Sequence, residues 1–208
     1  MYTPDAFRLD DPAALAEAIR ANPFATLVGM TDSGLLATHL PLLFDPSAGP
    51  HGTLLGHVAR ANPHARAIDP AVPSLAIFHG PQGYITPSWY EAKRETGKVV
   101  PTWNYVAIHA YGTLETFDDA DRLLDLVTRL TDRHEAGRAQ PWAVSDAPAD
   151  FVAGMVKAIV GVALRIDRIE GKAKLSQNRL AADRPRVRDG LRADGNAPLA
   201  DAMARANG

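Results

Sequence analysis

The amino-acid sequence predicts a mainly β fold of the α+β class, a small antiparallel β-barrel with helices at its periphery. Short segments in which apolar residues alternate with other residues, separated by turn residues, occupy most of the first half of the chain. Segments with helical spacing of apolar residues gather late. Regular alternation of strands and helices is missing, which argues against a Rossmann-type sheet and favours a barrel.

The first half of the chain supplies one helix and a series of short strands. Asp10, Asp11 and Pro12 are typical of a helix start, because proline is tolerated in the first turn. The helix is expected over 13–21, where Asn22-Pro23 ends it. Asp32-Ser33-Gly34 is typical of a hairpin turn, and Gly80-Pro81-Gln82-Gly83 indicates a second turn. Strands are expected over 24–31, 35–44, 52–58, 74–79 and 83–86.

The second half contains the clearest strand and the clearest helix. Over 104–116, one face mixes Tyr105, His109 and Tyr111 with small residues, which is not typical of a dry core. Beyond Arg179 the chain is polar and charged. Helices are expected over 118–138 and 149–160. A last strand is expected from Val162, with alternating Val162, Leu164 and Ile166, and ends at Glu170-Gly171. We therefore expect one domain over 1–178 with embedded helices, followed by a charged, weakly helical tail over 179–208.

Composition indicates a soluble globular protein and excludes several classes of function. Hydrophobic residues make up 46% of the chain and charged residues 22%. The chain has no cysteine, which excludes disulfides, iron–sulfur clusters and thiolate catalysis and fits a cytoplasmic location. The longest apolar stretch, 158–164, is too short to cross a bilayer, and no secretory signal is visible over 1–11.

Charge is distributed unevenly along the chain. The formal net charge is −2, which does not by itself indicate a nucleic-acid-binding protein. From Arg165 to Arg192, however, there are nine Lys/Arg and only four Asp/Glu. Such a basic stripe either binds phosphate, a polyanion or nucleic acid, or is simply a solvated surface.

The common catalytic and metal-binding signatures are absent from the sequence. There is no glycine-rich phosphate loop, no nucleophile elbow and no His-Glu-x-x-His motif. The seven histidines lie far apart, so no metal site is predicted. Most carboxylates fall on expected helix faces, where solvation explains them, and no catalytic residue is assigned.

Two tryptophan-bearing segments are the most informative feature. They are Thr-Pro-Ser-Trp-Tyr at 86–90 and Pro-Thr-Trp-Asn-Tyr at 101–105. Each combines a flat aromatic surface with hydroxyls and a proline, and the second adds an amide. This is the chemistry of a pocket wall for a planar ligand with polar edges. The alternative is core packing, which is the commoner role of aromatic residues. The candidate wall residues are Ser88, Trp89, Tyr90, Trp103, Asn104 and Tyr105.

A second polar run follows the last expected strand, at 171–179, with the sequence Gly-Lys-Ala-Lys-Leu-Ser-Gln-Asn-Arg. Lys174 could bind phosphate oxygens, while Gln177 and Asn178 could meet the edge of a heterocycle. Alternatively the run is a helix start capped by Ser176, with solvated cations. A weaker candidate set is His57 and Arg60, which could support a phosphate or cap a turn.

These motifs, in this order, resemble the PaiB family of FMN-binding split-barrel proteins, usually described as negative transcriptional regulators. The resemblance covers nearly the whole chain. Two long, non-generic motifs, at 84–90 and 99–105, make it specific. The segments that carry it are 1–4, 38–41, 56–63, 84–90, 99–105 and 174–179.

The resemblance implies a six-stranded antiparallel split barrel that holds FMN at a homodimer interface, with both subunits contributing to each site. It places Trp103, Asn104 and Tyr105 at the isoalloxazine side. Ser88, Trp89 and Tyr90 would form a companion wall. Lys174, Gln177 and Asn178 would contact phosphate, ribityl or ring edge, with His57 and Arg60 as additional contacts.

Three functions compete at this point. The resemblance implies a flavin-binding repressor of transcription that contacts promoter DNA; the basic stripe supports it, although no helix-turn-helix is evident. The second is an FMN-dependent oxidoreductase or flavin reductase, in which the flavin carries out hydride or electron transfer. The third is a store for a flavin or haem-type ligand. No membrane partner is expected.

Overall fold

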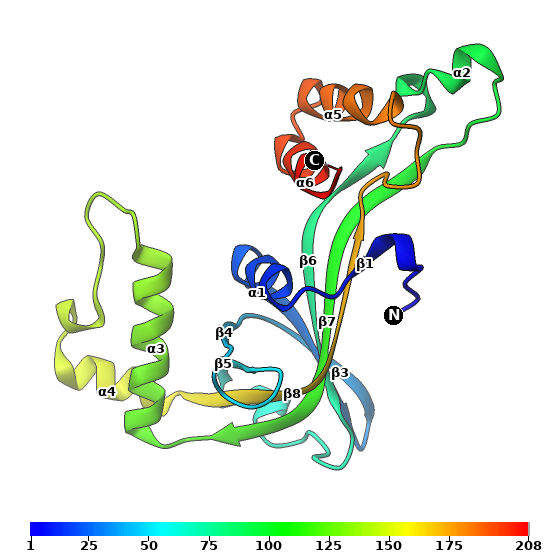
Figure 1. Ribbon diagram of the computed structural model, residues 1–208. Coiled ribbons are helices and arrows are strands. Elements are labelled where there is room, and N and C mark those ends of the chain that lie inside the picture. Colours follow the sequence, from blue (N-terminus) through cyan, green and yellow to red (C-terminus); the bar gives the residue numbers. More distant parts are fainter. Residues whose placement is uncertain (208) are drawn as a thin grey trace. The chain divides into compact units, whose positions relative to one another are not determined.

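The framework of the protein is a sheet accompanied by helices, shown in Figure 1. Within residues 1–207, which the computed structural model describes, the chain forms eight strands and six α-helices. The strands are β1 (Arg8–Leu9), β2 (Phe24–Thr31), β3 (Gly34–Pro41), β4 (Leu43–Asp45), β5 (Thr53–Ala59), β6 (Ser74–Ile85), β7 (Thr102–Phe117) and β8 (Ile159–Lys174). The helices are α1 (Pro12–Ala21), α2 (Ala92–Glu95), α3 (Ala120–Glu135), α4 (Ala149–Lys157), α5 (Asp183–Ala193) and α6 (Ala197–Asn207).

The strands follow the order β3-β2-β6-β7-β8-β5-β4 in the sheet, and β1 pairs with β8. The β1–β8, β2–β3, β4–β5 and β5–β8 pairs are antiparallel. Strands β1 and β4 have only two and three residues, so the sheet has six strands of substantial length. The predicted mainly β fold of antiparallel strands with accompanying helices is confirmed.

The chain divides into two compact units. The first unit comprises Met1–Asn22, Phe78–His109 and the chain from Glu170 onward. The second unit comprises Pro23–Ile77 and Ala110–Ile169. Strands β6, β7 and β8 therefore contribute residues to both units. The division into a domain over 1–178 and a tail over 179–208 stays a prediction.

Helix α1, in the first unit, begins where the sequence predicts. The Asp11 carboxylate accepts a hydrogen bond from the backbone N–H of Ala14 at 2.8 Å, and Pro12 occupies the first turn. The helix buries Leu15, Ala16 and Ile19. Local sequence signals at the cap and spacing of the apolar residues are therefore enough to define this element.

Helices α5 and α6 lie side by side in the first unit (Figure 1). Gly195, with a φ of 80°, makes the turn between them. Only weak helices were expected after Arg179, yet α5 and α6 each have 11 residues. Tertiary packing rather than local propensity stabilises them. Their shared core consists of Ile85, Tyr90, Leu175, Val187, Leu191, Leu199, Ala200, Ala202 and Met203.

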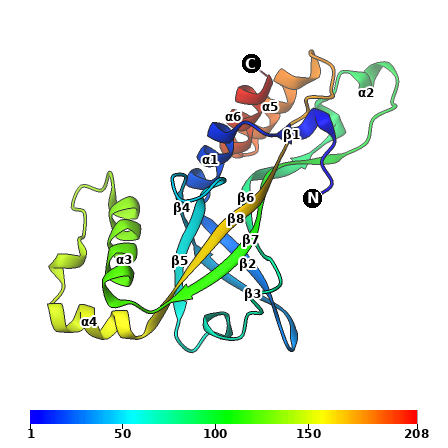
Figure 2. The ribbon, with the colours of Figure 1, turned by 60° about the horizontal axis from the view of Figure 1, so that its bottom comes forward.

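The second unit contains the predicted hairpin of β2 and β3, visible in Figure 2. Phe24 lies opposite Pro41, and Thr31 lies opposite Gly34, whose φ of 108° suits glycine. The return strand, expected over 35–44, instead divides at Leu42. The backbone N–H of Leu42 donates to the Pro23 carbonyl at 2.9 Å, and the residues beyond it pair with β5 as β4.

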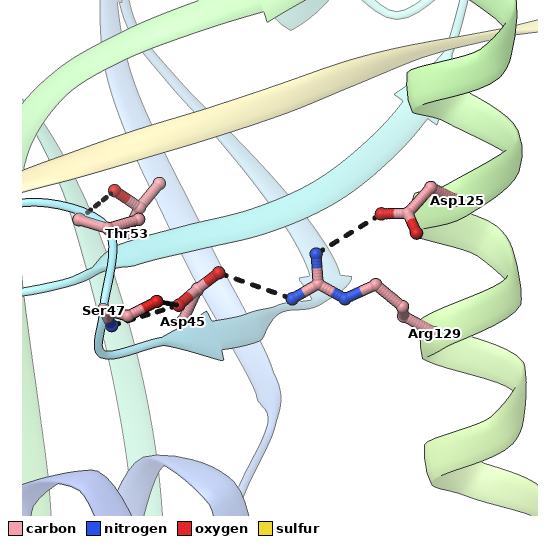
Figure 3. Close-up of polar contacts among 6 residues, drawn as sticks. Asp45, Ser47, Thr53, Asp125 and Arg129 are labelled. Atoms are coloured by element: carbon pink, nitrogen blue, oxygen red, sulfur yellow. Dashed lines mark hydrogen bonds and ion pairs between the residues drawn. The ribbon is translucent and has the colours of Figure 1, made fainter.

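Helix α3 packs within the second unit through an apolar core and a polar contact. The apolar core consists of Leu43, Leu126 and Leu130 with Leu55 and Phe117 packed against it. The Arg129 guanidinium lies 3.4 Å from Asp125 and 3.5 Å from Asp45, so it links the helix to β4 (Figure 3). Hydrogen bonds from Ser47, and then the charge of Arg129, hold the pKa of Asp45 below its usual value.

Some apolar side chains of the second unit are exposed. Trp142, in the loop between α3 and α4, is 48% exposed, and its backbone N–H donates to Glu135 Oε2 at 3.1 Å. Phe151 and Met155 of α4 are also exposed. No helix within residues 1–207 combines the length and apolar character needed to cross a membrane.

Two strand boundaries differ from the sequence prediction. Separate strands were expected over 74–79 and 83–86, but β6 is continuous from Ser74 to Ile85. A β-carbon at Gly80 would lie 2.9 Å from Val106 Cβ, so this glycine allows a close approach to β7 instead of making a turn. Strand β8, which was expected to end at Glu170-Gly171, continues to Lys174. Lys174 therefore lies in the strand and not after it.

Candidate functional site

Trp103 and Tyr105 line an open pocket beside β7 in the first unit. Trp103 is 48% exposed, and its indole N–H donates to Gln82 Oε1 at 3.2 Å. Its ring lies 6.4 Å from the ring of Tyr84, tilted by 60°. The indole is thus oriented but not buried. The pocket, of about 330 Å³, is lined by Met1, His79, Gly80, Gln82, Trp103, Tyr105, Val106, Ala107 and His109.

Asn104, between those two aromatic residues, is fully buried instead. Successive side chains of a strand alternate between its faces, so Asn104 does not share the face of Trp103 and Tyr105. Its side chain is 0% exposed, and its Nδ2 donates to Ser176 Oγ at 2.9 Å. The structure therefore brings the Trp-Asn-Tyr motif and the 171–179 run together through a buried hydrogen bond.

The other aromatic segment contributes mainly to the core of the first unit. Tyr90 is 2% exposed, and burial raises the pKa of its phenol, which the Arg179 charge partly offsets. Trp89 packs against the same core and against Gly190 of α5. Ser88 is exposed and accepts a hydrogen bond from Lys93 Nζ at 3.1 Å. None of the three lines the pocket of Trp103 and Tyr105.

The predicted polar run closes as a turn after β8. Gln177 Oε1 accepts from the backbone N–H of Leu175 at 2.7 Å, and Gln177 Nε2 donates to the Ala173 carbonyl at 2.5 Å. The Gln177 amide therefore binds backbone groups of the turn. Asn178 is exposed. Ser176 does not cap a helix, because its φ of 67° is left-handed and α5 begins only at Asp183.

Within residues 1–207, three cations near this turn have no acidic partner: Lys172, Lys174 and Arg179. Lys172 Nζ lies 5.2 Å from the centroid of the Tyr105 ring, and Lys174 Nζ lies 2.5 Å from Thr102 Oγ1. Burial, and then repulsion by the other two cations, lower the pKa of Lys174, while Tyr105 opposes that change. In the described part of the chain, no carboxylate lies within ion-pair distance of these three cations.

Gln82 lines the pocket and Lys172 lies beside Tyr105, but neither was among the candidate residues chosen from the sequence. Gln82 was assigned to a turn that does not form. Lys172 was placed after the strand, although its spacing of two from Lys174 is the signal that could have found it. Residues two apart on an extended strand point to the same side.

His57 and Arg60 lie in the second unit, on and directly after β5. Burial lowers the pKa of His57, which favours its neutral form. Arg60 Nε donates to the Lys157 carbonyl at 2.8 Å, and Nη2 donates to the Ile159 carbonyl at 3.0 Å. The guanidinium of Arg60 thus binds the end of α4 and the start of β8.

The structure gives no evidence for a metal centre in the part of the chain that it describes. Within residues 1–207, no three or more His, Asp or Glu side chains group so that they could hold a metal ion. The chemistry of the pocket therefore rests on aromatic rings, an amide and nearby ammonium and guanidinium groups. That set suits a planar ligand that carries an anionic group.

Comparison with known proteins identifies the family. Residues 1–168 match the family model described as "Putative FMN-binding domain". An uncharacterized protein of Aspergillus fumigatus is 34% identical over 222 residues, covering 85% of each chain. Protease synthase and sporulation protein PAI 2 of Bacillus subtilis is 32% identical over 204 residues, covering 98% of this chain and 95% of that protein.

Solved structures share the fold at low sequence identity. The flavocytochrome Anf3 of Azotobacter vinelandii has a TM-score of 0.58 at 13% identity, covering 80% of this chain and 69% of that one. An FAD and haem binding protein of Mycobacterium smegmatis has a TM-score of 0.56 at 19% identity, covering 80% and 73%. Together with the match over 1–168, the similarity to PAI 2 shows that the chain belongs to the PaiB family of FMN-binding-domain proteins.

Proposed function

We propose that the protein binds FMN beside β7, with the ring system against Trp103 and Tyr105 and the phosphate near Lys174. The observation that carries this proposal is an aromatic pocket whose Tyr105 lies beside Lys172 and interacts with Lys174. Within residues 1–207, no carboxylate lies within ion-pair distance of either lysine. Among the described residues, Lys172 and Lys174 donate to neutral oxygens only, the Tyr2 carbonyl and the Thr102 hydroxyl. Buried or half-buried cations without a countercharge are costly, and a phosphate would offset that cost through charge-assisted hydrogen bonds. FMN, when bound, supplies a redox-active isoalloxazine ring.

The residues present fit this cofactor in kind. Trp103 offers a π-surface, Gln82 an amide, and Lys172 and Lys174 offer ammonium groups for an anion. The pocket of about 330 Å³ lies at the small end of the range for ligand sites, about 300–1,000 Å³, so part of FMN would extend beyond it. We therefore assign the remaining wall to a second copy of the chain, in a homodimer with FMN at its interface.

The other predicted contacts take different parts in this proposal. Exposed Ser88 and Asn178 are available for polar contacts to the cofactor. Buried Tyr90, and Trp89 packed against the core, support the first unit from within. Arg60 is already bound to two backbone carbonyls, so it is the weakest candidate for a cofactor contact.

The biological output that we propose is negative regulation of transcription, with flavin occupancy or redox state as the signal. Its support is membership of the PaiB family and similarity to a relative named for protease synthesis and sporulation. Direct promoter binding should weaken steeply with rising salt, because Lys and Arg contacts to phosphates release counterions. Equal affinity for promoter DNA and random DNA, or no binding to either, would count against a role in transcriptional regulation.

An FMN-dependent oxidoreductase is the second candidate, and one observation favours it. The arginines of the basic stripe are largely engaged within the chain. Arg184 donates to the carbonyls of Gln177 and Arg179, Arg186 pairs with Glu91, and Arg192 pairs with Asp201. Two solved structures that share this fold are those of a flavocytochrome and of an FAD and haem binding protein. Bleaching of bound flavin by NAD(P)H without DNA binding would favour this candidate.

The direct test is an FMN titration of the purified protein, followed by absorbance and tryptophan fluorescence. Aromatic stacking is worth about 1–3 kcal/mol, so Trp103→Ala should weaken binding by about 5- to 150-fold. Trp142→Ala is the matched control, because Trp142 has the same 48% exposure but lies in the second unit. Equal affinities of the two variants would remove Trp103 from the site, and a wild-type protein without FMN affinity would refute the proposal. Gel filtration at the mass of one chain would contradict the homodimer.

A further inference from the structure

Ser176 has a backbone conformation that no other described non-glycine residue shares. Its φ of 67° lies in the left-handed region, and its side chain is buried. Such conformations are unfavourable for residues with a β-carbon and persist only where the surroundings hold them. The turn after β8 must therefore be held in place by specific contacts.

Asn104 provides one of these contacts. Its Nδ2 donates to Ser176 Oγ at 2.9 Å and lies 3.5 Å from Met203 Sδ, while the whole residue is inaccessible to solvent. Its amide oxygen is buried and accepts no hydrogen bond from the described residues. A buried amide that leaves one group unsatisfied is costly, so a role for its remaining hydrogen bond is expected.

Gln177 provides the next contacts, and they act on Lys174. The left-handed turn at Ser176 brings the Gln177 amide back over the end of β8. There it accepts from Leu175 N–H at 2.7 Å and donates to the Ala173 carbonyl at 2.5 Å. These two backbone groups flank Lys174 on either side. The Arg184 guanidinium in turn fixes the Gln177 carbonyl at 2.8 Å.

We infer that Asn104 and Gln177 are positioning residues that act through Lys174 and do not contact the cofactor themselves. The chain of contacts runs from Asn104 to Ser176, then through Gln177 to the backbone on both sides of Lys174. The ammonium group of Lys174 is thereby held beside Thr102, at the end of the strand that carries Trp103. This inference rests on the proposed FMN site and assigns the phosphate end of the ligand to Lys174.

A double-mutant cycle with two ligands tests the inference. FMN and riboflavin, which lacks the phosphate, are titrated against the wild type, Lys174→Met, Asn104→Ala, Gln177→Ala and the two double variants. Lys174→Met should weaken FMN binding about 10- to 100-fold, because a charge-assisted hydrogen bond is lost. Asn104→Ala and Gln177→Ala should each weaken FMN binding in the presence of Lys174. On the Lys174→Met background they should change it less than about twofold, and riboflavin affinity should stay constant throughout.

Additive losses, or a loss of riboflavin affinity in Asn104→Ala or Gln177→Ala, would show direct contact and overturn the inference while leaving the FMN site intact. Unchanged FMN affinity in either variant, or in Lys174→Met, would also overturn it. A wild-type protein that binds neither ligand would refute the proposed function itself, and the inference with it.

A matched pair at position 176 provides a test in which Asn104 itself is not replaced and its hydrogen bond is lost equally in both variants. Ser176→Gly and Ser176→Ala both remove the hydroxyl that Asn104 binds, but only glycine adopts a φ of 67° without strain. Ser176→Ala should therefore lose more FMN affinity than Ser176→Gly, with riboflavin unaffected and the circular dichroism spectrum retained. Equal FMN affinities for the two variants would show that the left-handed turn does not position Lys174.

Discussion

Replacing Gly190 with alanine is expected to destabilise the protein, whereas the same replacement at Gly154 should stabilise it. Both glycines lie inside helices, α5 and α4 respectively. Alanine is favoured over glycine in a helix interior by about 0.8–1.0 kcal/mol. Nothing lies within 4 Å of a β-carbon built at Gly154, so this gain should appear in full.

At Gly190 a second effect opposes that gain. A β-carbon there would lie 2.5 Å from Trp89 Nε1 and 2.6 Å from Trp89 Cδ2, well inside van der Waals contact. Displacing a large ring that packs against the core should cost about 1–3 kcal/mol. The helix term is common to both substitutions, so their difference measures the packing cost alone. We expect Gly190→Ala to be about 1–3 kcal/mol less stable than Gly154→Ala.

Urea unfolding followed by far-ultraviolet circular dichroism gives the two free energies of unfolding. A third variant, Trp89→Leu, supplies the control, because Gly190→Ala should become neutral or stabilising once the indole is removed. If Gly190→Ala raised the free energy of unfolding by as much as Gly154→Ala, the Trp89 indole would be able to move aside without a loss of stability. The close packing of Trp89 against Gly190 would then contribute nothing to stability.

Three further predictions follow from contacts outside the pocket. Burial lowers the pKa of His57 and His64 in the folded protein, so below about pH 6.5 the unfolded chain binds more protons than the folded one. The free energy of unfolding should therefore fall as the pH drops from 7 toward 5, by up to about 1.4 kcal/mol per pH unit for each histidine. Urea titrations at several pH values should show a smaller pH dependence for His64→Gln than for the wild type. The buried Asp183 carboxylate accepts a hydrogen bond from the backbone N–H of Glu91 at 2.7 Å. Asp183→Ala should therefore lower the free energy of unfolding by about 1–3 kcal/mol. A loss below roughly 0.5 kcal/mol, the scatter of such data, would show that water replaces the carboxylate. Arg60→Met should lower the free energy of unfolding by only about 1 kcal/mol, because the guanidinium is exposed. FMN affinity should stay unchanged, and a tenfold loss of affinity would indicate that Arg60 contacts the cofactor.

Local signals predicted the elements whose boundaries depend on nearby residues. The start of α1 at Pro12 follows from the Asp11 cap, and the bounds of β2 match the predicted segment 24–31 because the following turn fixes them. The helix expected over 118–138 is found as α3 from Ala120, with Asp119 as its cap. In each case the residues that decide the boundary are within four positions of it.

Elements that depend on distant partners were predicted less well. Gly80 and Gly83 have the composition of a turn, but each serves a close contact, with Val106 and with Leu199. Trp89 and Tyr90 have the composition of a pocket wall, yet Leu191 and Val187, about a hundred positions away, make them part of a core. The burial of Asn104 follows from strand alternation, but its partner Ser176 is 72 positions away and could not be read from the chain.

The three tryptophans lie in three different environments, so their fluorescence can report on three different parts of the chain. Trp103 lines the pocket, Trp89 packs against α5, and Trp142 lies exposed in the second unit. Variants that retain a single indole would report separately on ligand binding at Trp103, on the packing of α5 at Trp89 and on the surroundings of Trp142 in the loop between α3 and α4. Because the chain has no cysteine, an introduced thiol would also carry a label at one chosen position, without background labelling of native thiols.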